Sequence, residues 1–107
     1  MTTLSRDLLS HLRRHHAGKE NAVKREALLE TVRLWGYDTG DRDLRECYAE
    51  LGACAGPNGV WWPASWSEVE ECAHYLDDKA IGHFMRAKHL REVHAALRQI
   101  KQLELWG

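Results

Sequence analysis

The stretch TGDRDLRECYAELGACAGPNGVWWP, residues 39 to 63, decides the expected fold. Its first part predicts a helix over 41–51, and Gly52 suits the end of that helix because glycine readily adopts the left-handed conformation found there. Two short apolar runs, 53–55 and 60–62, flank the turn residues GPNG, which is typical of a β-hairpin. Strand alternation places Trp61 on the opposite face from its neighbours, where we expect its indole to be exposed.

Two further helices are expected before this stretch. Apolar residues recur at helical spacing over 4–15 and 24–34, and Gly36 suits the end of the second helix. Between them, Ala22 and Val23 are candidates for a short strand that pairs with the edge of the hairpin. The chain has 107 residues, which supports one small core, so we expect an α+β, mainly α fold.

A continuous apolar stripe follows the hairpin. Its steps of three and four residues continue to Leu103 without a proline, which predicts one long helix over 66–103. Such a helix is ~57 Å long at ~1.5 Å per residue. The alternative is a break near Gly82 that lets the second half fold back.

The length of this helix predicts a homodimer. A domain formed by residues 1–64 is too small to cover the far half of a rod formed by residues 65–107, and a second copy would supply the missing cover. The expected dimer interface consists of Phe84, Leu90, Val93, Leu97, Ile100 and Leu103.

Charge is strongly segregated along the chain. Residues 1–25 carry six basic and two acidic side chains, residues 26–78 carry three and twelve, and residues 79–107 carry six and two. This layout favours electrostatic pairing between segments or subunits. It disfavours a molecule that binds nucleic acid through a uniformly basic surface.

The sequence gives no sign of catalysis, a cofactor or a membrane span. Cys47, Cys54 and Cys72 lack a CxxC spacing, so we expect reduced thiols and, with no signal peptide or long apolar run, a cytoplasmic protein. Cys72-x-His74 looks like half of a metal site, but side chains two apart on a helix diverge and no second pair follows, so no metal site is expected. Without a nucleophile beside a base or a phosphate-binding loop, neither an enzyme nor a small-molecule substrate is expected.

The order of helix, short strand, two helices, hairpin and long helix resembles winged helix-turn-helix proteins encoded by phages and prophages. The segments that carry this resemblance are His16-x-Gly18-x-x-Asn21-Ala22-Val23, Asp41-Arg42-Asp43-Leu44-Arg45, and residues 59–63 followed by Ser67-Glu68-Val69-Glu70-Glu71. The resemblance implies three helices and a hairpin wing, followed by the long C-terminal helix.

In such proteins the third helix enters the major groove of double-stranded DNA and the wing reaches the backbone or minor groove. Arginine and asparagine suit these positions, and lysine suits phosphate contacts. The expected DNA contacts are Arg42, Arg45, Asn58, Lys19, Lys24 and Arg25. Acidic residues on the same helix oppose phosphate, and Arg42 has the spacing to pair with Glu46 instead.

Two functions follow from these observations. The first is a non-enzymatic DNA-binding regulator, or an accessory factor in phage DNA metabolism, that acts as a homodimer. The alternative is a winged helix used as a protein-interaction or assembly module without DNA binding, with the acidic middle of the chain and Trp61 as its docking surface.

Overall fold

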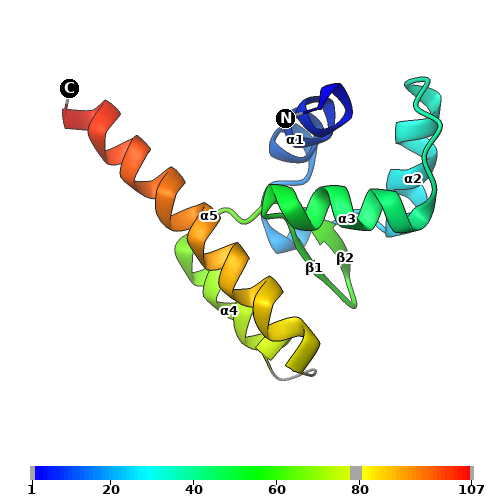
Figure 1. The fold of residues 1–107 in the computed structure, drawn as a ribbon. Helices are drawn as coiled ribbons and strands as arrows, with labels where there is room; N and C mark the ends of the chain where they lie inside the picture. Colours follow the sequence, from blue (N-terminus) through cyan, green and yellow to red (C-terminus); the bar gives the residue numbers. More distant parts are fainter. Residues whose placement is uncertain (1, 78–80, 107) are drawn as a thin grey trace.

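The computed structural model describes the backbone of residues 2–77 and 81–106, and the side chains of residues 2–76 and 86–99. Figure 1 shows the elements in chain order. They are α1 (Thr3–His15), the 3-10 turn η1 (Lys19–Asn21), α2 (Arg25–Leu34), α3 (Asp41–Leu51), β1 (Cys54–Gly56), β2 (Gly59–Trp61), α4 (Trp66–Asp77) and α5 (Ile81–Trp106). The described chain is mainly helical with a small antiparallel sheet, which confirms the expected α+β, mainly α class. Within it, no helix combines the length and the apolar character that crossing a membrane requires.

The first core lies between α1, α2 and α3. Each helix contributes buried side chains four residues apart, the spacing that places two side chains on one helix face. The buried members of this core are Leu8, Leu12, Leu28, Val32, Leu44, Tyr48, Ala53 and Val60. The periodicity seen in the sequence therefore identified the inward faces of these helices correctly.

The hairpin forms where the sequence predicted it. The two strands pair antiparallel, with Cys54 opposite Trp61 and Gly56 opposite Gly59. Pro57 and Asn58 form the exposed turn between them. This turn is referred to below as the wing tip.

β2 is also paired along its other edge. The Val23 N–H donates to the Val60 carbonyl at 2.8 Å, and the Val60 N–H donates back to the Val23 carbonyl at 2.8 Å. One residue beyond β2, the Trp62 N–H donates to the His16 carbonyl at 2.7 Å. The expected short strand is therefore present at Val23 as an isolated bridge, and β2 is the central strand of the molecule.

The two faces of the hairpin belong to two different cores. Val60 is 1% exposed and packs in the first core, as alternation predicted. Trp61 points to the other face, but it is only 5% exposed. The expectation that Trp61 is exposed is wrong, because α4 and α5 cover this face of the hairpin. The other expectation for the tryptophans, that they seal the hairpin against the C-terminal helical segment, agrees with the packing of Trp61 and Trp66.

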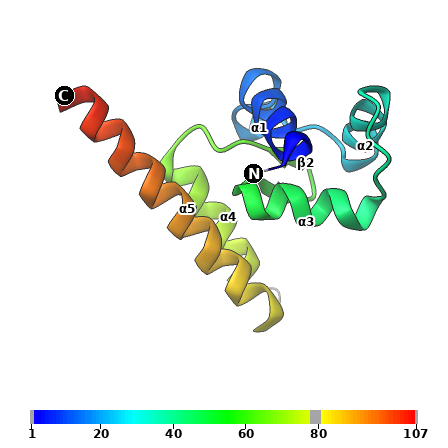
Figure 2. The same cartoon turned by 45° about the horizontal axis from the view of Figure 1, so that its top comes forward.

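The long C-terminal helix expected over 66–103 is also wrong. α4 ends at Asp77 and α5 begins at Ile81, and Figures 1 and 2 show the two helices running antiparallel, side by side. Their contact and the hairpin enclose the second core. Its buried members are Cys54, Trp61, Val69, Cys72, Ala73, Leu76, Ala87 and Leu90. The alternative of a fold-back close to Gly82 is the arrangement found.

This fold-back removes part of the expected dimer interface. Leu90 is 3% exposed and lies in the core of its own chain, and Val93 is half-buried against Gly52 of α3's C-terminus. Leu97 is 44% exposed. The expected interface residues Phe84, Ile100 and Leu103 lie outside the described side chains. The argument that a second copy must cover Leu90 and Val93 therefore fails.

β2 approaches Val23 so closely at Gly59 that a side chain at this position should destabilise the fold. The φ of Gly59 is +118°, and a Cβ there would collide with the Val23 carbonyl oxygen. We expect Gly59→Ala to lower the free energy of unfolding by ~2 kcal/mol or more, from backbone strain and the clash together. Urea denaturation measures this loss.

Two glycines serve as controls for this variant. At Gly36, φ is +101° and a Cβ meets nothing within 4 Å, so Gly36→Ala isolates the backbone strain. At Gly40, φ is −100° with equally open space, so Gly40→Ala should cost only the ~0.5–1 kcal/mol that follows from alanine being a poorer N-cap of α3 than glycine. Equal losses at Gly59 and Gly36 would contradict the tight contact between β2 and Val23.

Candidate nucleic-acid interface

The outward face of α3 carries two arginines that are paired within their own helix. Arg42 Nε lies 3.3 Å from Glu46 Oε1, and Arg45 Nε lies 3.3 Å from Asp41 Oδ2. The Arg42 side chain is 86% exposed. The local pairing of Arg42 with Glu46, which the spacing of four residues allows, is thus the arrangement of the free protein.

Asp41 joins the start of α3 to the start of α2. Its Oδ1 lies 2.8 Å from Arg25 Nε, while its other oxygen contacts Arg45. The Arg25 Nε is buried, and its N–H is not aligned for a hydrogen bond, so the contact is an ion pair. Arg25 also lies 4.0 Å from Glu26 through its Nη2, so the two guanidinium groups of this cluster are balanced by two carboxylates.

Lys24 supplies a cation to the wing tip. Its ammonium group donates to the Pro57 carbonyl at 3.4 Å, beside the exposed Asn58. The hairpin has no lysine or arginine of its own, and Lys24 is far from Pro57 in sequence. The neighbouring Val23–Val60 bridge brings them together, which is why the sequence alone did not reveal this contact.

Lys19 lies beside α4, away from the wing tip, and its ammonium group already forms an ion pair with Glu71. Its Nζ lies 2.7 Å from Glu71 Oε1, and its backbone N–H donates to Glu68 Oε1 at 3.0 Å. The hydrogen bond with Glu71 raises the pKa of Lys19, so the ammonium form is retained. Lys19 therefore ties η1 to α4, and the expected phosphate contact from this residue is not favoured.

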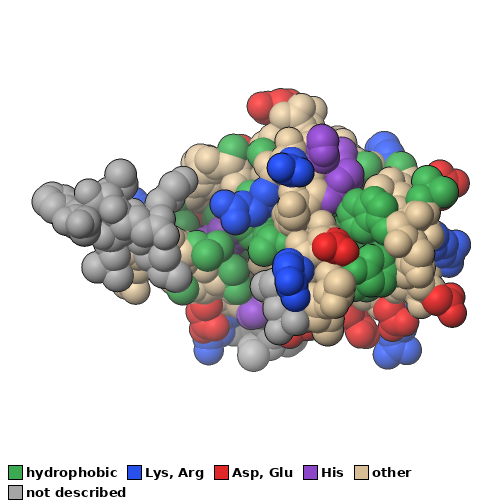
Figure 3. All heavy atoms as spheres, turned by 90° about the horizontal axis from the view of Figure 1, so that it is seen from above, with side chains coloured by type: hydrophobic (Ala, Val, Ile, Leu, Met, Phe, Trp, Pro, Cys, Tyr) green, Lys and Arg blue, Asp and Glu red, His purple; other side chains and the backbone are tan. Residues whose placement is uncertain are grey.

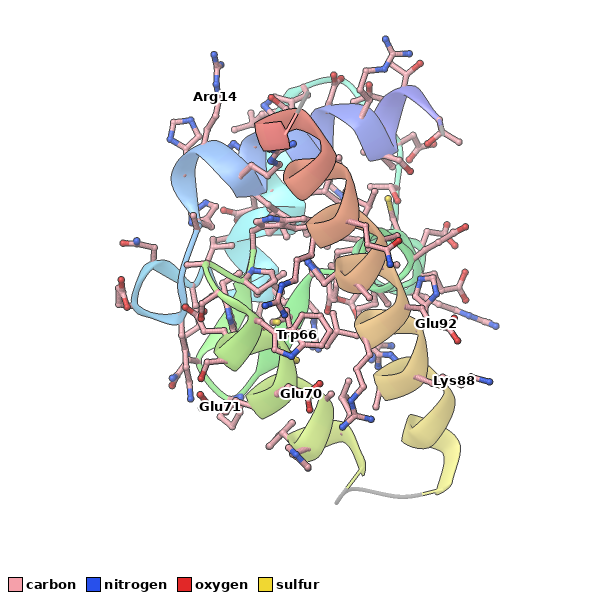
Figure 4. All side chains as sticks on the ribbon, turned by 90° about the vertical axis from the view of Figure 1, so that its left-hand side faces the viewer. Arg14, Trp66, Glu70, Glu71, Lys88 and Glu92 are labelled. Atoms are coloured by element: carbon pink, nitrogen blue, oxygen red, sulfur yellow. The ribbon has the colours of Figure 1, made fainter. Side chains whose placement is uncertain are left out.

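Acidic side chains of α4 bind both of its neighbours. Figure 4 shows Glu70 and Glu71 leaving the same turn of α4. Glu70 Oε1 lies 3.3 Å from Arg91 Nε of α5, whereas Glu71 pairs with Lys19. Part of the acidic middle of the chain thus pairs with its basic ends inside one molecule, as the segregated charge suggested for segments.

His94 of α5 is a buried polar residue, which corrects the expectation from the sequence that it is a helix-surface or interface group. It is 9% exposed, and its ring centroid lies 5.0 Å from that of Trp62. Nε2 lies 2.8 Å from the Gly52 carbonyl, which only accepts, so Nε2 carries the proton. Burial lowers the pKa of His94, and the hydrogen bond to Gly52 opposes that shift in part. His94 is therefore a neutral link between α5 and the end of α3.

Three histidines gather at the end of α1. The ring of His11 lies 5.0 Å from that of His15, 5.1 Å from that of His16 and 5.1 Å from that of Trp35. Partial burial, then the charges of His16 and His15, lower the pKa of His11. The four-residue spacing of His11 and His15 was the signal for this cluster in the sequence.

Neither the histidines nor the cysteines form a metal site in the part of the chain that the structure describes. There, no group of three or more His, Cys, Asp or Glu side chains is arranged to hold a metal ion. Cys54 and Cys72 lie together in the second core. The hydrogen bond with Cys72 and burial raise the pKa of Cys54, so this residue remains a thiol and packs as a small apolar side chain.

Comparison with known proteins found no matching protein-family model, no matching curated protein and no matching solved structure. The chemistry of these surfaces therefore carries the functional argument.

The buried His94 and the partly buried His11 make the free energy of unfolding depend on pH. Because the pKa values of His94 and His11 are lowered in the folded state, the unfolded state binds more protons near and below the ordinary histidine pKa of ~6.5. Stability should be complete above pH ~7 and should fall as the pH drops through ~6.5. Urea denaturation at pH 8 and pH 5.5 measures this difference.

The variant His94→Gln tests the assignment. The packing lost in this variant lowers the free energy of unfolding equally at both pH values. The difference in that free energy between pH 8 and pH 5.5 therefore reports only the proton-linked part. That difference should be smaller in the variant than in the wild type. An unchanged difference would contradict a neutral, buried His94.

Proposed function

We propose that the protein is a winged helix-turn-helix DNA-binding protein without enzymatic activity. The observation that carries the proposal is the Val23–Val60 bridge, which sets the wing tip beside the start of α2. The Arg25–Asp41 pair then joins the start of α2 to the start of α3. In this proposal α3 enters the major groove of double-stranded DNA, and the hairpin is the wing.

The ion pairs on α3 do not prevent this role. Exposed pairs are worth only ~0–1 kcal/mol, and the side chains of Arg42 and Glu46 are 86% and 67% exposed. A phosphate oxygen or a guanine edge can therefore replace Glu46 at little cost. The carboxylates remain on the helix, however, so binding should be weak and strongly dependent on salt.

Phosphate contacts are assigned to the residues around the wing tip. Lys24 and Asn58 lie there and are exposed. Arg25 and Arg45 share Asp41, and Arg25 also pairs with Glu26, so these two arginines reach the DNA backbone only by exchanging exposed carboxylate partners for phosphate. These residues form the proposed interface together with Arg42, and Lys19 is left out because it lies beside α4, where its backbone and side chain bind Glu68 and Glu71.

We further propose that the protein is a homodimer and acts in the cytoplasm. Its proposed role is that of a phage or prophage regulator, or of an accessory factor in phage DNA metabolism. α5 has 26 residues and α4 has 12, so α5 extends ~20 Å past α4 at ~1.5 Å per residue. Figure 2 shows this end projecting from the rest of the described chain. Pairing of two such ends would present two α3 helices and increase the affinity for DNA through avidity.

A DNA-binding assay tests the proposal. Fluorescence anisotropy with a labelled duplex at ~50 mM salt, where phosphate contacts are strongest, should detect binding that weakens as salt rises. Arg42→Ala with Arg45→Ala should reduce the affinity ~10-fold or more, and Lys24→Ala should reduce it several-fold and lower the salt dependence.

Arg14→Ala is the control, since Arg14 projects from α1 away from the body of the protein (Figure 4). It should leave the affinity nearly unchanged. A complete lack of duplex binding at ~50 mM salt, or an equal loss with Arg14→Ala, would rule out the proposed interface.

A further inference from the structure

A groove runs between α1 and α5, on a different part of the molecule from the proposed DNA contacts at the wing tip. Its volume is about 1040 Å³, and its lining comes from α1, α3, the connection 62–65, the start of α4, and α5. Trp62, Pro63 and His94 contribute to the lining between the two helices. Figure 3, seen from above, shows hydrophobic side chains beside Lys and Arg side chains on this face.

The size of the groove matches a helix. A three-turn helix is ~16 Å long and ~10–12 Å across, so one that is half embedded fills ~800 Å³. Small-molecule sites are usually smaller, at ~300–1000 Å³, and enclose most of their ligand. The walls are themselves two helices, between which a third can pack.

The lining has the side chains that dominate protein interfaces. Leu9, Val93 and Leu97 provide an apolar surface, and Leu97 is 44% exposed. Trp62 and Trp66 add aromatic area. Tryptophan and arginine are the residue types most enriched among those that contribute strongly to binding.

The net charge of the groove indicates which kind of partner it would bind. Arg13 of α1 and Arg98 of α5 both line it, and neither forms an ion pair with another described residue. Arg98 lies over the Trp66 ring, 5.7 Å from its centroid, which holds the guanidinium at the edge of the apolar surface. Glu50 also lines the groove, so the two arginines leave a net charge of one positive unit.

A second copy of this chain fits that charge poorly. The end of α5, the segment that projects, carries Arg98 and Lys101 against Glu104, so it has the same sign of charge as the groove. The most acidic helix, α4, already buries Val69 and Cys72 in its own core. We therefore propose that the groove binds an amphipathic helix of a partner protein, with an apolar face flanked by Asp or Glu.

Two designed peptides test this proposal without DNA, so the result is independent of the proposed function. Each is a capped helix of roughly four turns with leucines at positions i, i+3, i+4 and i+7, which form one helix face. One peptide carries glutamates on both sides of the leucine face, and the other carries lysines at the same positions. NMR titration of the ¹⁵N-labelled full chain measures affinity and maps the backbone amides that shift.

The glutamate peptide should bind at least ~10-fold more tightly than the lysine peptide, with shifts confined to residues around the groove. Arg13→Glu combined with Arg98→Glu should reverse this preference. Arg14→Glu combined with Lys88→Glu makes the same charge change at exposed positions outside the lining and should leave the preference intact.

Equal affinity for the two peptides, no binding at ~1 mM peptide, or a preference that survives the Arg13 and Arg98 reversal would overturn the proposal. Sedimentation velocity measures the oligomeric state and tests whether a second copy of the chain fills the groove. A dimer that dissociates on Leu97→Glu, together with a groove that accepts neither peptide, would show that a second copy fills it and would also overturn the proposal.

Discussion

The pairing of β2 on both of its edges is the constraint on which the rest of this structure depends. β1 lies on one edge, and the reciprocal hydrogen bonds between Val23 and Val60 close the other. A two-stranded hairpin alone is marginally stable in water. Here both of its faces are also buried, because the side chains of β2 alternate between two cores. Packing in either core therefore holds β2 in the position that packing in the other core requires.

The same strand sets the position of every surface discussed above. The bridge to Val23 leads directly into α2, so Lys24 reaches the wing tip and Arg25 reaches Asp41. On the opposite face, Trp61 gives α4 and α5 a surface to cover, and Lys19 anchors α4 through Glu71. The proposed DNA interface and the groove beside α5 thus depend on one short strand.

Much of this could be predicted from the sequence because it is local. The i, i+4 apolar pairs of the first three helices, the GPNG turn and the short strand at Val23 follow from spacing and turn chemistry. Arg42 and Glu46 are also four residues apart, and their pairing was anticipated. The glycine that ends α3, Gly52, adopts the expected left-handed conformation with φ of +93°.

The failures involve contacts between distant parts of the chain. Alternation assigned Trp61 to the correct face, but it does not reveal whether that face meets water or another core. An apolar stripe with steps of three and four residues is the same in a single rod and in two antiparallel helices, so it did not distinguish them. The contacts of Lys24 with Pro57 and of Lys19 with Glu71 have no local signature, and they changed the expected interface most.

Native-state hydrogen exchange at the Val60 amide tests the central role of β2 most directly. If β2 is fixed by both edges and both cores, this amide exchanges only through global unfolding, with the same opening free energy as the slowest amides of α3. An opening free energy several kcal/mol lower, with α3 still protected, would mean that the hairpin opens on its own and would contradict this account.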